Sequence, residues 1–121
     1  MYERTDLQFI QDILESINAA MEFVAEFDLD SFSSDRKTKS ATIRELEIIG
    51  EVASRISAAK KTEYSSVPWR LMEDFRNVLS HEYFGVNDEV VFDIVRHKLP
   101  ELKVQMDEII LQENNLKNIL T

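Results

Sequence analysis

The stretch TDLQFIQDILESINAAMEFV, residues 5–24, decides the fold class of this chain. Its apolar residues recur at alternating steps of three and four, which places them on one stripe of an α-helix. The stripe contains Leu7, Ile10, Leu14, Ile17, Met21 and Val24, and it is widened by Ile13, Ala20 and Phe27. We therefore expect a helix that packs against more than one neighbour. The capping-box spacing of Thr5 and Gln8 predicts its first turn.

The same pattern predicts a second helix that begins within residues 35–40 and runs to about Lys60. Its inner stripe contains Leu46, Ile49, Ala53 and Ile56. Residues 28–35 are rich in Asp and Ser and are interpreted as a loop, as are residues 60–67. Gly50 lies inside this helix, where glycine costs about 1 kcal/mol relative to alanine. Close contact with another helix is the expected compensation, and a dimer partner is one possible source of it.

Three further helices are expected in the second half of the chain. Pro68 suits the first turn of a third helix, which should end near Gly85. Asn87 or Asp88 can cap a short fourth helix. Pro100 is expected to open a last helix. The polar tail, residues 113–121, is expected either to dock or to fray.

Composition supports helices joined by short loops. Gly 2 and Pro 2 are low counts for a sheet protein, because tight turns between strands use both residues. A chain of 121 residues without repeats or linkers predicts one domain, residues 1–121. The expected fold class is all-α, an up-and-down bundle of four to five helices.

Composition also limits the function. Cys 0 excludes disulfides and thiolate chemistry, and neither a signal peptide nor a membrane-spanning run is evident. We expect a soluble cytoplasmic protein with no membrane partner. The net charge of -9 opposes broad attraction to nucleic acid, so any RNA binding must be local or shared with a second subunit.

The segment RNVLSHEYFGV, residues 76–86, carries the groups best suited to phosphate chemistry. Arg76 is a permanently charged, forked donor for phosphate oxygens, and His81 can exchange a proton near neutral pH. On a regular helix Arg76 and Tyr83 share a face, while His81 lies to one side with Asn77 close enough to orient its ring. This geometry permits a site without requiring one, because an Arg and a His at this spacing are more often a surface pair.

The motif resembles Arg-x-x-x-x-His-x-Tyr of the HepT-like toxins, which contain a HEPN domain. Other stretches are similar in the same order along the chain, namely residues 12–17, 44–51, 67–69, 83–86, 94–95 and 99–100. One departure is Glu73-Asp74 before the motif, where many members carry a small residue and methionine. Two acids at this place are expected to tune or weaken phosphate binding.

The resemblance implies a homodimer that cleaves RNA without a metal or cofactor. Arg76 would hold the scissile phosphate, His81 would act as general base or acid, and Asn77 would support the site. It also implies a nucleotidyltransferase antitoxin of the MNT type as partner, which in some pairs transfers AMP to the tyrosine of the motif, here Tyr83.

Other residues could carry chemistry, and each has a plainer interpretation. Asp93 and His97 have a metal-ligand spacing, but two ligands do not make a site and an exposed helix end is favoured. Trp69 could stack on a base or anchor the core. Arg44 with Glu47 and Glu51 is interpreted as a solvated helix face. The cations Arg55, Lys60 and Lys61 could add positive charge near a cleft.

The leading hypothesis is thus a ribonuclease toxin. The alternative is a non-catalytic helical module that docks a nucleotidyltransferase and binds or accepts a nucleotide. A helical dimer with a purely structural role is a third interpretation.

Overall fold

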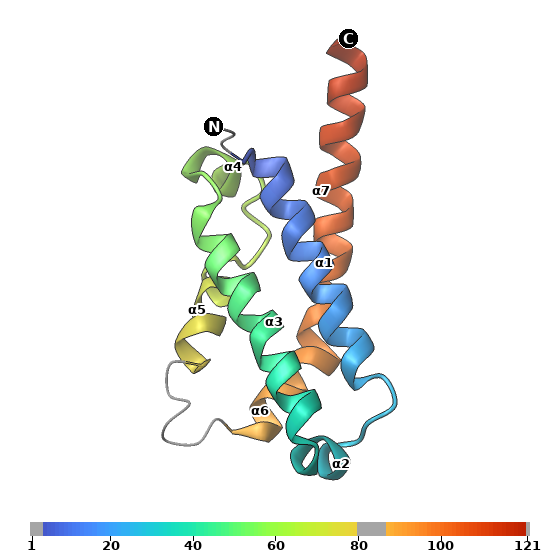
Figure 1. Ribbon diagram of the computed structural model, residues 1–121. Helices are drawn as coiled ribbons and strands as arrows, with labels where there is room; N and C mark the ends of the chain where they lie inside the picture. The colour runs from blue at the N-terminus through green and yellow to red at the C-terminus, as the bar shows by residue number, and fades with distance from the viewer. Residues whose placement is uncertain (1–3, 80–86, 121) are drawn as a thin grey trace.

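The computed structural model describes residues 4–79 and 87–120, with the side chains at positions 78, 79 and 120 left out. Four helices form an up-and-down bundle: α1 (Asp6–Val24), α3 (Arg36–Arg55), α5 (Trp69–Leu79) and α7 (Leu99–Leu120) (Figure 1). The shorter helices are α2 (Leu29–Ser34), α4 (Ala58–Glu63) and α6 (Asp88–Asp93), and a π-helical segment, Ile94–Lys98, precedes α7. No strand occurs in the described ranges, and the expected all-α bundle is confirmed.

One apolar core lies between these helices, with α1 packed against both α3 and α7 and α3 packed against α5. Ile10, Ile13, Ile17 and Ala20 of the first stripe are fully buried, as the pattern predicts. The inner stripe predicted for α3 is also buried. The capping box at Thr5 is present: the amide of Thr5 donates to the side chain of Gln8, and the amide of Gln8 donates to the hydroxyl of Thr5. The periodicity of the apolar residues therefore specifies the main packing of the bundle.

Residues 29–34 are helical, so the loop predicted for residues 28–35 was wrong. Asp28 and Ser31 form a second reciprocal capping box, in which each side chain accepts a bond from the backbone amide of the other. Phe32 is fully buried and its ring lies 5.3 Å from that of Phe92 on α6. Asp and Ser here begin a helix, and burial of one aromatic ring holds it against the bundle.

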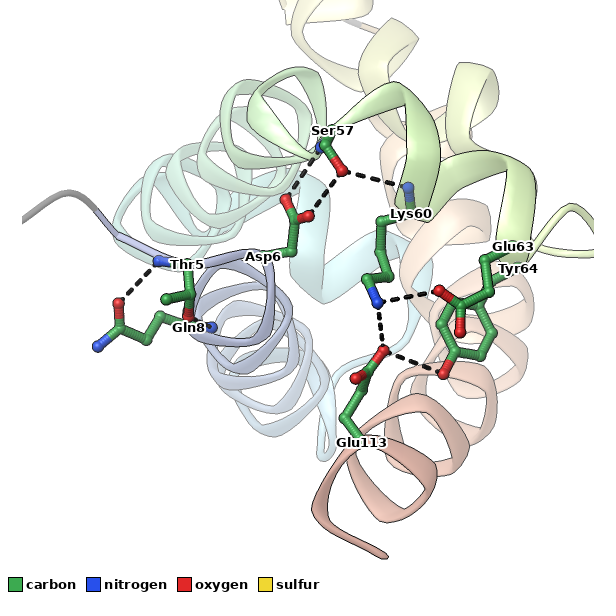
Figure 2. Close-up of polar contacts among 8 residues, drawn as sticks. All are labelled: Thr5, Asp6, Gln8, Ser57, Lys60, Glu63, Tyr64 and Glu113. Atoms are coloured by element: carbon green, nitrogen blue, oxygen red, sulfur yellow. Dashed lines mark hydrogen bonds and ion pairs between the residues drawn. The ribbon is translucent and has the colours of Figure 1, made fainter. Parts of the chain in front are cut away.

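The helix predicted to run to about Lys60 ends at Arg55, and α4 occupies the first half of the loop predicted for residues 60–67. Ile56 and Ser57 interrupt the helix because Ser57 is fixed by α1. The carboxylate of Asp6 accepts bonds from the amide and the hydroxyl of Ser57, at 3.0 and 2.6 Å (Figure 2). The Ser57 hydroxyl also accepts from the amide of Lys60 and so caps α4.

The predicted cap at Asn87 is confirmed: its side chain accepts bonds from the amides of Glu89 and Val90. The last helix expected to open at Pro100 is α7, which begins at Leu99. It follows α6 and the π-helical segment without a break, with helical backbone at Ile94 and Leu99. Pro100 lies in the first turn of α7 but has no amide to bond to the preceding turn. The wider turn of the π-helical segment accommodates the proline within a continuous helix.

Gly50 marks the point where α3 crosses α5. A Cβ atom at position 50 would lie 2.8 Å from the backbone nitrogen of Arg76, 3.1 Å from its Cβ and 3.2 Å from the carbonyl oxygen of Met72. The close helix contact expected for this glycine therefore exists within the chain, on α5. Glycine permits the approach because any larger residue would have to displace the backbone of α5.

We predict that Gly50→Ala destabilises the protein. Alanine normally stabilises a helix interior relative to glycine, yet here its methyl group must move α5, at a cost of about 1–3 kcal/mol. Urea unfolding followed by circular dichroism measures the change. Ser40→Ala, at an exposed position of the same helix, is the control and should be neutral or slightly stabilising. A Gly50→Ala protein more stable than the wild type would contradict the crossing.

Candidate functional site

Two of the four predicted site residues, Arg76 and Asn77, lie on α5. The other two, His81 and Tyr83, lie outside the described residues. The structure therefore gives the position of the cationic half of the predicted site and says nothing about the imidazole or the phenol.

The crossing of α3 and α5 fixes the backbone of Arg76. Gly50 lies against its backbone nitrogen and Cβ, and the neighbouring Phe75 is buried in the core. The guanidinium group, in contrast, is turned outward, with 45% of the side chain exposed. A rigid base and an exposed cationic head are what a phosphate-binding arginine requires.

Among the described residues, this guanidinium forms an ion pair with a carboxylate of α3. Glu51 Oε2 lies 3.4 Å from Arg76 Nη1, and Glu51 Oε1 lies 3.1 Å from Arg55 Nη2. The hydrogen bond from Arg55 is the main reason why the pKa of Glu51 is lowered, and Arg76 contributes in the same direction. Glu51 is therefore a carboxylate shared by two arginines. All three side chains are about half exposed or more.

The two acids that depart from the family pattern have partners other than Arg76. Glu73 pairs with Lys61 at 2.9 Å, and Asp74 accepts a hydrogen bond from the amide group of Asn77 at 3.4 Å. Asn77 thus lies next to Arg76 in the chain with its side-chain amide near Asp74. Because Lys61 offsets the charge of Glu73, we expect Glu73 to weaken phosphate binding less than the sequence alone suggests.

Lys60 forms ion pairs with residues other than Glu51. It pairs with Glu113 of α7 at 2.6 Å and with Glu63 at 3.0 Å, and Tyr64 donates to Glu113 (Figure 2). These contacts hold α4 against α7 and raise the pKa of Lys60, mainly through the bond with Glu113. They also fix the tail through Glu113, so it docks in part. Of the three cations predicted to lie near a cleft, Arg55 is the one that shares a partner with Arg76.

The remaining candidates follow their plainer interpretations. Trp69 is buried and its indole nitrogen donates to the carbonyl of Tyr64, so it anchors the core and offers no exposed ring for stacking. His97 Nε2 lies 3.7 Å from Asp93 Oδ1 on an exposed face. Within residues 4–79 and 87–120, no group of three or more His, Asp or Glu side chains is arranged to hold a metal ion.

Sequence reasoning missed the link between Glu51 and Arg76. Glu51 and Arg55 are four apart on α3, so their local pair is predictable. The contact with Arg76 spans 25 positions and depends on the helix crossing. The available signal was Gly50, because a glycine that permits close helix contact also brings its neighbour Glu51 to that contact.

The fold and the site define a helical bundle with an exposed arginine at a fixed helix crossing. A family model described as ribonuclease HepT-like matches residues 13–109. The chain belongs to this HepT-like family, as the sequence motifs predict.

Individual relatives match most of this chain. The chain is 39% identical over 102 residues to "Putative RNase MJ0127" of Methanocaldococcus jannaschii, covering 84% of each protein. It is 36% identical over 107 residues to "Probable ribonuclease HepT" of Thermococcus cleftensis, covering 88% of this chain and 97% of the relative. Comparison with solved structures found no match. Among the described residues, no helix is both long and apolar enough to span a membrane.

Proposed function

We propose that this chain is the toxin of a toxin–antitoxin pair and an endoribonuclease that cleaves RNA without a metal. The match of residues 13–109 to the HepT-like ribonuclease family carries the proposal. The exposed guanidinium of Arg76, supported by the crossing at Gly50, agrees with it.

In the proposed reaction, the ribose 2′-hydroxyl attacks the adjacent phosphorus and the bond to the 5′-oxygen of the next nucleotide breaks. His81 accepts the proton of the 2′-hydroxyl or supplies one to the leaving oxygen. Arg76 binds the non-bridging phosphate oxygens and offsets the charge that increases in the transition state. Asn77 supports the arrangement from the next position on α5.

We further propose that the enzyme is a homodimer, because the net charge of -9 makes a single Arg–His pair a weak attraction for RNA. Two subunits would bring two such pairs into one cleft. A surface suited to a second copy lies on α5, α6 and α7. There, exposed Leu71 lines two neighbouring grooves, of about 610 and 410 Å³, which also contain Val104 and Val90 respectively.

This surface, which we call the Leu71 face, includes groups of both charges. Lys98 lines both grooves, Glu101 lines the larger one, and Asp74 and Asp93 line the smaller one. In a two-fold dimer the same patch meets itself, so cations of one copy can pair with acids of the other. Asp74 and Phe75, which line the smaller groove, directly precede Arg76 in the chain.

The proposed antitoxin is a small nucleotidyltransferase of the MNT type that transfers AMP from ATP to the Tyr83 oxygen and releases pyrophosphate. The added phosphate would place negative charge and bulk near Arg76, where the RNA phosphate binds.

Induced expression of the wild-type chain without its partner is predicted to arrest growth and fragment total RNA. Arg76→Ala and His81→Ala should restore growth and intact RNA, since loss of an acid–base group typically costs a factor of about 10²–10⁴. His97→Ala, which removes the other histidine, is the matched control and should stay toxic. Normal growth with a folded wild-type protein would favour a non-catalytic module that docks the nucleotidyltransferase.

Leu71→Glu is predicted to convert the dimer to a monomer and to lower RNA cleavage, because it places a charge in the apolar centre of the Leu71 face. Sedimentation velocity measures the mass. Leu111→Glu is the control: Leu111 is exposed on α7 but does not line either groove, so this variant should stay dimeric. A Leu71→Glu protein that remains dimeric would exclude this interface.

Co-expression with the neighbouring nucleotidyltransferase is predicted to add one or more AMP groups at Tyr83, measured by intact-mass and peptide mass spectrometry. Tyr83→Phe should remove that modification. Unmodified Tyr83 alongside a catalytically active partner would contradict this part of the proposal.

A further inference from the structure

We propose that Arg55 is a second RNA-phosphate ligand and that Glu51 occupies the phosphate position when RNA is absent. This inference rests on the proposed function and extends the site beyond Arg76. It concerns the cluster of Arg55, Glu51 and Arg76, which we call the arginine clamp.

The geometry of the clamp resembles that of two arginines around one anion. The Glu51 carboxylate places one oxygen 3.1 Å from Arg55 and the other 3.4 Å from Arg76. A phosphodiester also presents two non-bridging oxygens that carry a single negative charge. It can therefore take the place of the carboxylate between the same two guanidinium groups.

The exposure of the clamp favours displacement over permanent pairing. The side chains of Glu51, Arg55 and Arg76 are 52%, 60% and 45% exposed. Ion pairs exposed to this degree contribute little to stability, so an incoming phosphate loses little by breaking them. A carboxylate that served only to hold Arg76 in place would be expected to lie buried with it.

The neighbouring charges single out Arg55. Lys60 is held by Glu113 and Glu63, and Lys61 is held by Glu73. Arg55 is the last residue of α3, five positions after Gly50, and it shares the Glu51 carboxylate with Arg76. Since Gly50 sets how closely α3 approaches α5, the same contact that fixes Arg76 also sets the spacing of the clamp.

The test measures RNA binding separately from cleavage. All variants are made in a His81→Ala background, and a fluorescently labelled, single-stranded oligoribonucleotide of mixed sequence is titrated at several salt concentrations. Arg55→Ala should lower the affinity about tenfold, the effect of losing one charge-assisted contact. The slope of log K against log salt should become shallower by about 0.7 for each lost phosphate contact.

Glu51→Gln should raise the affinity, because it removes the competing negative charge and leaves both arginines in place. Arg44 and Glu47 provide the matched controls, since they form a similar exposed pair on the same helix, at 3.1 Å. Arg44→Ala and Glu47→Gln should change neither affinity nor slope. Thermal unfolding checks each protein, and Arg55→Gln replaces Arg55→Ala if the latter unfolds.

Three results would overturn the clamp. These are wild-type binding by Arg55→Ala, an equal loss in Arg44→Ala, or weaker binding by Glu51→Gln, which would make Glu51 a positioning residue. Failure of the clamp and failure of the proposed function are distinguishable. If the protein with His81 intact cleaves RNA but Arg55→Ala binds RNA normally, only the clamp is wrong. If Arg55→Ala weakens RNA binding but the protein with His81 intact does not cleave RNA, only the catalytic proposal is wrong.

Discussion

The close crossing of α3 and α5 at Gly50 is the contact on which the site depends. Because position 50 has no side chain, the backbone of Arg76 can lie directly against α3. This contact fixes the base of the arginine and brings Glu51, which also pairs with Arg55 of its own helix, to the guanidinium group of Arg76. A helix interior loses stability by including glycine, and here the loss is offset by helix packing. The packing of the core and the arrangement of the charged surface therefore have one origin.

The charge distribution explains how an acidic chain can still handle an anionic substrate. The net charge of -9 belongs to the chain as a whole, whereas two arginines gather at the crossing. Glu51 partly neutralises them in the free protein, and Lys60 and Lys61 are held by other acids. In the proposed function, attraction to RNA is local and depends on exchange of one carboxylate for one phosphate. Pairing two subunits through the Leu71 face would double that local charge.

The sequence predicted the main helices well because their apolar periodicity is set by burial, as for Ile10, Ile13 and Ile49. It failed where a few polar groups decide the backbone. Asp28 and Ser31 were interpreted as loop residues, yet they cap α2. The break at Ser57 depends on Asp6, 51 positions away, and no local pattern reveals it. For the candidate site, the motif proposes Arg76 and Asn77, whereas the link between Glu51 and Arg76 is visible only in the tertiary contact. Pro100 correctly marked the start of α7, but the π-helical turn that joins α7 to α6 was not predicted.

In the proposed function, this chain cleaves RNA through Arg76 and His81 without a metal. The most direct measurement incubates the purified protein with an end-labelled oligoribonucleotide in excess chelator and identifies the new ends. We predict cleavage to 2′,3′-cyclic phosphate and 5′-hydroxyl ends, with no cleavage when the 2′-hydroxyl is absent at the cut site. Equal cleavage by Arg76→Ala, or activity that disappears with chelator and returns with a divalent metal, would contradict it.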